Sequence, residues 1–257
     1  MYPVLFEPFG FAISSFGVLV ALGFLAGGKL GEIVFRERGL DPDLAWRVMI
    51  YCMIGGVLGS KLWYAAEHVV RGETGTFIGF FLSRAGMTWY GGLVGGTFAG
   101  MLASRVTKVP FMTLANVTAI ALAVGQCFGR IGCFLVGDDY GRRSEAAIAV
   151  AFPRGAPPTI DPLSGEVFSV LPTQLYEAGW LAAVGVWLWT RRKSSPTLFG
   201  EYLILAGAGR LWIELFRTNP AFLGPLTNAQ VVAVGCILFG AVLWLAMRAR
   251  EPGAAPA

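Results

Sequence analysis

The chain has 257 residues, of which 55% are hydrophobic and only 14% are charged, and its mean hydropathy is +0.63. A soluble domain carries about 25% charged residues, so the composition excludes an ordinary soluble protein and indicates a polytopic membrane protein. The formal net charge is +4. The basic residues are spread over short loops between apolar segments, which argues against a nucleic-acid partner.

Seven apolar segments have about the length that a membrane-spanning helix needs, which is roughly 20 residues. They cover residues 13–35, 45–68, 88–104, 112–136, 174–190, 199–217 and 229–248. The run Phe77–Leu82 is too short to span, and the third segment is short enough that we expect it to start earlier. The sequence therefore predicts an all-α integral membrane protein with seven transmembrane helices.

Lysine and arginine are unequally divided between the loops on the two predicted sides. Alternate loops carry nine basic residues: Arg36, Arg38, Arg105, Lys108, Arg191, Arg192, Lys193, Arg248 and Arg250. The opposite loops carry six: Arg71, Arg84, Arg142, Arg143, Arg154 and Arg217. Because basic loops stay in the cytoplasm, we expect an outside N-terminus and a cytoplasmic C-terminus. The residues before the first helix contain Glu7 and no basic residue, unlike the start of a cleaved signal peptide.

The connection 137–173 contains "FPRGAPPTIDPLSGE" and is rich in proline and glycine. We expect it to form a small irregular head on the outer, periplasmic face. No second domain or internal repeat is evident, so residues 1–250 are expected to form one transmembrane domain. The last residues, 251–257, "EPGAAPA", are expected to be a short disordered tail.

Few side chains in the sequence are suited to binding a metal ion. The four cysteines lie in apolar stretches and form no C-x-x-C pair, and His68 is the single histidine. A metal site needs convergent cysteine, histidine or carboxylate ligands, so we expect neither a metal site nor an organic cofactor.

Glycines recur in the third segment at a spacing of four. Gly92, Gly96 and Gly100 form a double G-x-x-x-G motif, with Gly91 and Gly95 adjoining. This spacing puts glycines on one helix face and allows a neighbouring backbone to approach. Two interpretations follow: close helix packing, or a smooth wall along which acyl chains or a substrate backbone slide.

Charged residues inside the apolar segments point to a ligand. An ionised side chain in a bilayer costs roughly 2.5–3.5 kcal/mol on insertion scales, so Arg130 and Arg210 need partners. Glu214 lies four residues after Arg210 and can pair with it on one helix face. Two guanidinium groups at similar depth suit a phosphate, because each can donate two parallel hydrogen bonds. The sequence thus favours an anionic lipid as ligand, against a charge network that only locks the helices.

Six motifs, in order along the chain, resemble those of the bacterial phosphatidylglycerol–prolipoprotein diacylglyceryl transferases. They are "FGVLVALGFLAGGKL", "GGVLGSKLWY", "RAGMTWYGGLVGG", "GRIGCFLVGDDYGR", "LPTQLYE" and "GRLWIELFR". The resemblance covers nearly the whole chain. It implies an enzyme of the bacterial plasma (inner) membrane that moves the diacylglyceryl group of phosphatidylglycerol onto the lipobox cysteine thiol of a preprolipoprotein, forming a thioether and releasing glycerol phosphate.

The resemblance also implies roles for individual residues. Arg130 and Arg210 would stabilise the leaving phosphate, Glu214 would orient Arg210, and Tyr90 occupies a position treated as catalytic. The remaining positions would line the lipid headgroup or peptide region: Gly91, Gly92, Asp138, Gly141, Gln174, Tyr176 and Arg217. The expected partners are therefore phosphatidylglycerol, lipobox peptides and membrane lipid.

The sequence departs from the family pattern at several positions. Tyr90 and Leu171 replace two family histidines, and Cys133 and Val136 replace two asparagines. These departures leave two alternatives open: a diverged paralogue with another acceptor or lipid, and a non-catalytic lipid-binding protein. A transporter is disfavoured, because the spans show no corresponding broken helices or repeats.

Overall fold

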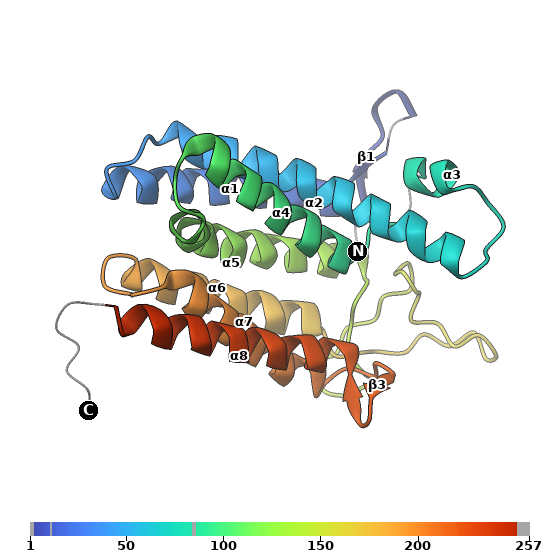
Figure 1. The fold of residues 1–257 in the computed structure, drawn as a ribbon. Coiled ribbons are helices and arrows are strands. Elements are labelled where there is room, and N and C mark those ends of the chain that lie inside the picture. Colours follow the sequence, from blue (N-terminus) through green and yellow to red (C-terminus); the bar gives the residue numbers. More distant parts are fainter. Residues whose placement is uncertain (1–2, 11, 84–85, 251–257) are drawn as a thin grey trace. The chain divides into compact units, whose positions relative to one another are not determined.

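The computed structural model describes residues 3–10, 12–83 and 86–250 (Figure 1). Eight α-helices lie in these residues: α1 (Ser15–Glu37), α2 (Asp43–Val70), α3 (Phe77–Leu82), α4 (Trp89–Thr107), α5 (Phe111–Val136), α6 (Thr173–Arg191), α7 (Leu198–Glu214) and α8 (Asn228–Arg248). Two small antiparallel hairpins pair β1 (Val4–Phe6) with β2 (Ile13–Ser14) and β3 (Ala221–Leu223) with β4 (Leu226–Thr227). A 3-10 turn, η1 (Pro8–Gly10), lies between β1 and β2. The tail predicted at 251–257 lies outside the described residues.

Each of the seven predicted segments is a helix, with ends within three residues of those predicted. Within the described part of the chain, four helices, α1, α2, α5 and α8, are long and apolar enough to cross a membrane. The prediction of a mostly helical membrane protein is therefore confirmed, while the count of seven spans stays a prediction. The short run Phe77–Leu82 is α3, a helix of 6 residues. The two hairpins had no counterpart in the predicted elements.

The third segment differs from its prediction in a specific way. We expected it to start earlier than residue 88, but α4 begins at Trp89 and gains its length at the other end, reaching Thr107. Thr88 has an extended backbone, and Gly86 has a φ of +83°. Neither conformation continues a right-handed helix, so α4 cannot extend in that direction.

The chain packs as two compact units, Gly31–Thr118 and the remainder, Met1–Leu30 with Ala119–Ala257. In the first, α2 lies against α4 along a seam of glycines. A Cβ atom added at Gly91 or Gly95 would overlap the carbonyl oxygen of Gly59 or Gly55, so the two backbones are in direct contact. Close helix packing, one of the two interpretations of the glycine spacing, is seen. Its nearest contacts are made by the adjoining Gly91 and Gly95, however, whereas a Cβ atom at Gly96 would meet nothing nearer than 3.6 Å.

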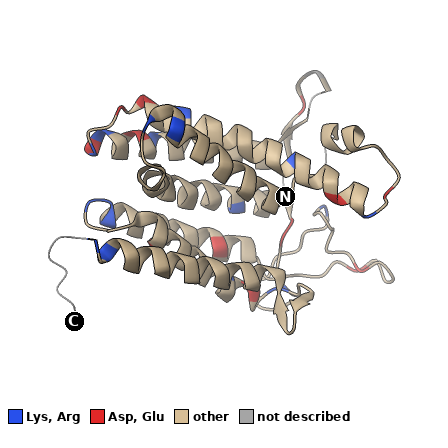
Figure 2. Ribbon diagram, in the orientation of Figure 1, with Lys and Arg blue, Asp and Glu red and all other residues tan. Residues whose placement is uncertain are grey.

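In the second unit, α6, α7 and α8 lie side by side and alternate in direction (Figure 1). Glycines again allow close contact, because a Cβ atom at Gly240 would be 2.7 Å from the Gly200 carbonyl oxygen. The alternation puts the start of α6, the end of α7 and the start of α8 at one end. At the other end lie the basic residues of the α6–α7 connection and Arg248 (Figure 2).

The segment 137–173 contains neither a helix nor a multi-residue strand before Thr173, as its composition predicts. Isolated bridges hold it, such as Arg143 with Val170 and Ile160 with Val167. Its first part is anchored to its own end, since the Gly141 amide donates to the Leu171 carbonyl at 2.9 Å. The segment 137–173 is therefore irregular but hydrogen-bonded, and it lies next to the start of α6 and the end of α7.

Candidate active site

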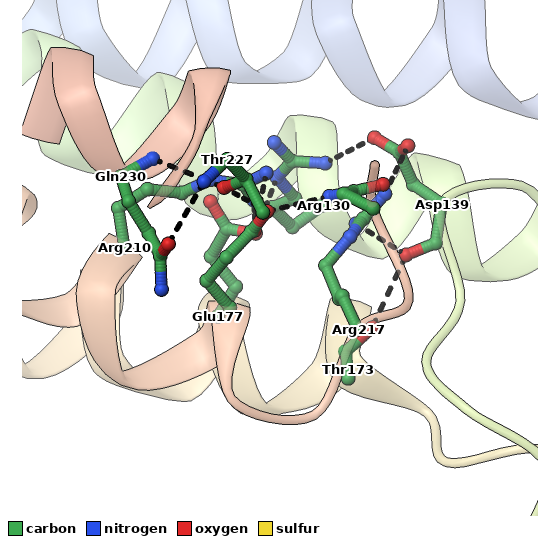
Figure 3. A network of polar contacts seen from close by, with 10 residues as sticks. Arg130, Asp139, Thr173, Glu177, Arg210, Arg217, Thr227 and Gln230 are labelled. Carbon is green, nitrogen blue, oxygen red and sulfur yellow. Dashed lines mark hydrogen bonds and ion pairs between the residues drawn. The ribbon is translucent and has the colours of Figure 1, made fainter. Parts of the chain in front are cut away.

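Three arginines and three carboxylates form one network in the second unit, which holds α5 from Ala119 onward and all of α6, α7 and α8 (Figure 3). The arginines are Arg130 on α5, Arg210 on α7, and Arg217 just after α7. The carboxylates are Asp139 in the segment 137–173, Glu177 on α6 and Glu214 at the end of α7. The network thus lies where the ends of four helices and the start of the head come together.

Glu177 joins the two arginines that the sequence singled out. Its Oε2 atom lies 3.0 Å from Arg130 Nε and 3.4 Å from Arg210 Nη1. The Glu177 side chain is 13% exposed, so the two cations meet at a mostly buried carboxylate. The expected convergence of Arg130 and Arg210 is confirmed, while their role toward a phosphate stays a prediction.

Glu214 anchors Arg210 from the opposite side, and the predicted pair is present. Glu214 Oε2 lies 3.1 Å from Arg210 Nη2, and the side chain is only 1% exposed. Its Oε1 accepts hydrogen bonds from Asn219 Nδ2 and Thr227 Oγ1, both at 2.7 Å. Thr227 also caps α8 in a capping box with Gln230. Arg210 is thereby fixed by α6, α7 and the start of α8.

Asp139 closes the network on its exposed side. Its Oδ2 lies 2.7 Å from Arg130 Nη1, and its Oδ1 lies 2.7 Å from Arg217 Nη2. Its backbone carbonyl accepts from Arg217 Nη1 at 2.6 Å and from Thr173 Oγ1 at 3.1 Å. Partial burial raises the pKa of the Asp139 carboxyl, but the Arg217 and Arg130 guanidinium groups outweigh it and bring the pKa to about 2.

The neighbouring residues of the head contribute polar and packing contacts. Gln174, which is 1% exposed, donates from Nε2 to the Asp138 carbonyl at 2.6 Å. Burial raises the pKa of the Asp138 carboxyl. Gly141 has no room for a side chain, because a Cβ atom there would be 2.6 Å from Thr173 Cγ2 and 2.7 Å from the Phe216 carbonyl oxygen. The absence of a side chain at Gly141 therefore lets the loop that carries Asp138 and Asp139 lie directly against Thr173 and Phe216.

The other predicted site residues lie elsewhere. Tyr176 packs against aromatic rings, with its centroid 6.4 Å from Trp212 and 5.9 Å from Phe216. Tyr90 belongs to the unit 31–118 and lies beside two tryptophans, Trp63 at 6.4 Å and Trp89 at 5.4 Å between ring centroids. The adjoining Gly91 and Gly92, in the same unit, face α2.

Sequence reasoning missed Asp139 and Glu177 as members of the site. A signal for Glu177 was present, because it ends the motif "LPTQLYE" three residues after Gln174, on the same helix face. Asn219 and Thr227 gave no such signal. Asn219 reaches Glu214 through the irregular chain just after α7, and the hairpin of β3 and β4 brings Thr227 to it. Within the described ranges, no cluster of three or more histidine, cysteine or carboxylate side chains is arranged to hold a metal ion.

Together, the fold and the network define a helical membrane protein with a cluster of ionised side chains at one end of a helix bundle. The chain belongs to the prolipoprotein diacylglyceryl transferase family, whose model matches residues 3–246. The resemblance carried by the six motifs is thus confirmed.

Individual relatives match over nearly their full length. A Nostoc protein is 33% identical over 96% of this chain and 90% of its own length. A Clostridium tetani protein is 31% identical over 93% of this chain and 95% of its own. A Chlorobaculum tepidum protein is 33% identical over 98% of this chain and 92% of its own. Each of these relatives is named a phosphatidylglycerol–prolipoprotein diacylglyceryl transferase.

Proposed function

We propose that this chain transfers the diacylglyceryl group of phosphatidylglycerol to the lipobox cysteine thiol of preprolipoproteins. Family membership over residues 3–246 supports the reaction, as do full-length relatives named for it. The structural observation that carries the proposal is the meeting of Arg130 and Arg210 at one carboxylate. These two cations, together with Arg217, which pairs with the same Asp139 carboxylate as Arg130, would supply the positive charge for the lipid phosphate.

The reaction requires charge stabilisation on the leaving group. The cysteine sulfur attacks an sp³ carbon of the lipid glycerol, a C–S bond forms, and the C–O bond to phosphate breaks. The electron pair leaves with glycerol phosphate, so negative charge grows on the phosphate oxygens. Guanidinium groups held in place beforehand stabilise this charge without having to reorganise. Arg130 and Arg210 supply the cations, and Glu214 with Glu177 holds Arg210 in position.

The acceptor thiol must lose its proton, since a free cysteine has a pKa near 8.5 and the thiolate is the nucleophile. Tyr90 stands where the family has a histidine, and a phenol offers a hydrogen-bond donor where an imidazole would offer a base. We propose a catalytic role for Tyr90 from its position in the family motif alone. The lipid headgroup and the peptide are assigned to Gly91, Gly92, Asp138, Gly141, Gln174, Tyr176 and Arg217.

The proposed topology is one transferase domain, residues 1–250, with seven spans in the bacterial inner membrane. The shorter helices α4, α6 and α7 would span together with the four longer ones. In the unit of α5 to α8, the network and the basic α6–α7 connection lie at opposite helix ends. The positive-inside rule then puts the network and the head 137–173 at the outer face and the C-terminus in the cytoplasm.

A product assay tests the activity. Purified protein, phosphatidylglycerol and a lipobox peptide should give the thioether-linked peptide and glycerol phosphate, both measured by mass spectrometry. Arg130→Ala should abolish the product, and Tyr90→His should keep or raise it. The exposed Arg154 lies in the same head segment, so Arg154→Ala is the matched control and should behave as wild type. Absence of product where another family member turns over would remove the proposal.

Two alternatives have specific support. Tyr90 and Leu171, at histidine positions of the family, favour a transferase with another acceptor or lipid. Headgroup-dependent lipid binding without complementation of a transferase-depleted cell would identify it. The arginines are already paired with carboxylates, an arrangement that can hold helices together without taking part in a reaction. This pairing favours the second alternative, a non-catalytic lipid-binding protein. In that case, Arg130→Ala and Arg210→Ala would leave the host phenotype unchanged.

A further inference from the structure

The arginines assigned to the lipid phosphate are already occupied by carboxylates. Arg130 contacts Asp139 at 2.7 Å and Glu177 at 3.0 Å, while Arg217 contacts Asp139 at 2.7 Å. Three guanidinium groups face three carboxylates, so the formal charge of the network is zero. A phosphodiester that entered this network intact would add a negative charge to a balanced site.

One of these carboxylates must therefore leave its arginine partners if the site binds an anionic lipid. We infer that the Asp139 carboxylate occupies the place of the substrate phosphate on Arg130 and Arg217, and that phosphatidylglycerol displaces it on binding. This inference rests on the proposed function, because it concerns the same site. It assigns Asp139 the role of an internal competitor that tunes affinity for the lipid and its leaving group.

Burial and attachment single out Asp139 among the three carboxylates. Its side chain is 47% exposed, whereas those of Glu177 and Glu214 are 13% and 1% exposed. The two glutamates are fixed on helices, and Glu214 accepts two further hydrogen bonds. Asp139 lies in an irregular segment, so its carboxylate can leave at the lowest cost in packing.

The backbone of Asp139 is held separately from its side chain. Its carbonyl accepts hydrogen bonds from Arg217 Nη1 and Thr173 Oγ1. The carboxylate can therefore rotate away while the loop stays attached to Arg217 and α6. Arg130 Nη1 and Arg217 Nη2 would then be free to donate to phosphate oxygens, with the charge of the network restored to balance.

The exchange has a consequence for product release. Glycerol phosphate, the leaving group, carries more negative charge than the lipid phosphodiester and would be held tightly by bare guanidinium groups. Return of the Asp139 carboxylate to Arg130 and Arg217 would help to expel it. Asp139 should therefore weaken binding of the lipid and of glycerol phosphate together, whereas a residue that merely supports the fold would not.

The test uses Asp139→Asn in the full-length protein. The native φ of Asp139 is +57°, and asparagine tolerates this left-handed conformation. Asp139→Gly is the second variant, since glycine adopts the same backbone without strain. Asp161→Asn is the matched control, because it removes a carboxylate from the same head segment while its oxygen can still accept from the Leu163 and Ser164 amides.

Two quantities are measured for each variant: the KM for phosphatidylglycerol, and binding of glycerol phosphate by calorimetry, which needs no turnover. Because the Asp139 side chain is about half exposed while its arginine partners are mostly buried, we expect Asp139→Asn and Asp139→Gly to lower both the KM and the Kd by about three- to tenfold. Binding of phosphate-free diacylglycerol should not change, and Asp161→Asn should match wild type.

Unchanged or weaker binding of glycerol phosphate in both variants would overturn the inference, as would failure of both variants to fold. Either result would make Asp139 a support for Arg130. The proposed function fails separately, if wild-type protein yields no thioether product. Tighter binding of glycerol phosphate in the variants would then still support the exchange.

Discussion

Glu177 is the residue on which the geometry of the two central arginines depends. One oxygen contacts both guanidinium groups, at 3.0 and 3.4 Å. Without that charge, Arg130 and Arg210 would repel each other across a mostly buried space. The Glu177 carboxylate therefore sets the separation of the two guanidinium groups and the orientation in which Arg130 is held.

Replacing Glu177 by glutamine should accordingly damage both stability and activity. Removing one partner of a buried ion pair costs about 3–5 kcal/mol, and partial exposure here should reduce this to about 2–4 kcal/mol. We expect a lower thermal midpoint and at least about a tenfold loss of turnover in the product assay. Glu145→Gln, at an exposed position of the head, is the control. Wild-type turnover in Glu177→Gln would show that the arginines do not need their shared carboxylate.

The ion pairs of Asp139 should make the stability of the folded protein depend on pH in the acid range. The pKa of its carboxyl is lowered from 3.8 to about 2 in the folded protein. A lowered folded-state pKa stabilises the protein above the unfolded value, and this contribution is lost as the pH falls through the folded value. Thermal midpoints of the wild type should therefore fall between about pH 4 and pH 2 more steeply than those of Asp139→Asn. Parallel curves would mean that Asp139 does not pair with the arginines in solution.

At the scale of elements, long apolar segments are what the sequence predicts well. Each of the seven predicted segments is a helix, because about 20 apolar residues in a membrane must satisfy their backbone within one helix. The hairpins could not be predicted in this way, since strands of two or three residues carry no periodicity. The turn of β3 and β4 nevertheless brings Thr227 to Glu214. The pair Arg210 and Glu214 follows from spacing alone, whereas Glu177 and Asp139 join through tertiary contacts.

The glycine seam between α2 and α4 permits a test at neighbouring positions. A Cβ atom at Gly95 would overlap the Gly55 carbonyl oxygen, whereas one at Gly96 would be 3.6 Å from the Cys52 carbonyl oxygen, an ordinary contact. Gly95→Ala should therefore force the helices apart and cost about 1–3 kcal/mol. Gly96→Ala should be neutral or stabilising by up to about 1 kcal/mol, because alanine favours the helix. Thermal unfolding of the two variants in one detergent compares them directly, and equal midpoints would contradict the close packing.

At the scale of the whole molecule, the proposed reaction depends on the side of the membrane that the head faces. Lipobox cysteines can reach the network only if the head and the network share the outer face. In the unit of α5 to α8, the basic α6–α7 connection and the network lie at opposite helix ends, so labelling one loop at each end decides the orientation. Leu163, which is 97% exposed in the head, and Ser194, in the α6–α7 connection, are suitable positions.

Leu163→Cys should react with a membrane-impermeant maleimide in cells whose inner membrane is intact. Ser194→Cys should react only after that membrane is permeabilised, because three consecutive basic residues, Arg191 at the end of α6 and Arg192 and Lys193 after it, are retained in the cytoplasm. The unmodified protein measures background labelling, since its cysteines lie within helices and are buried or partly buried. If Ser194→Cys reacted first and Leu163→Cys only after permeabilisation, the network would face the cytoplasm. A preprolipoprotein thiol delivered at the outer face could then not reach Arg130 and Arg210.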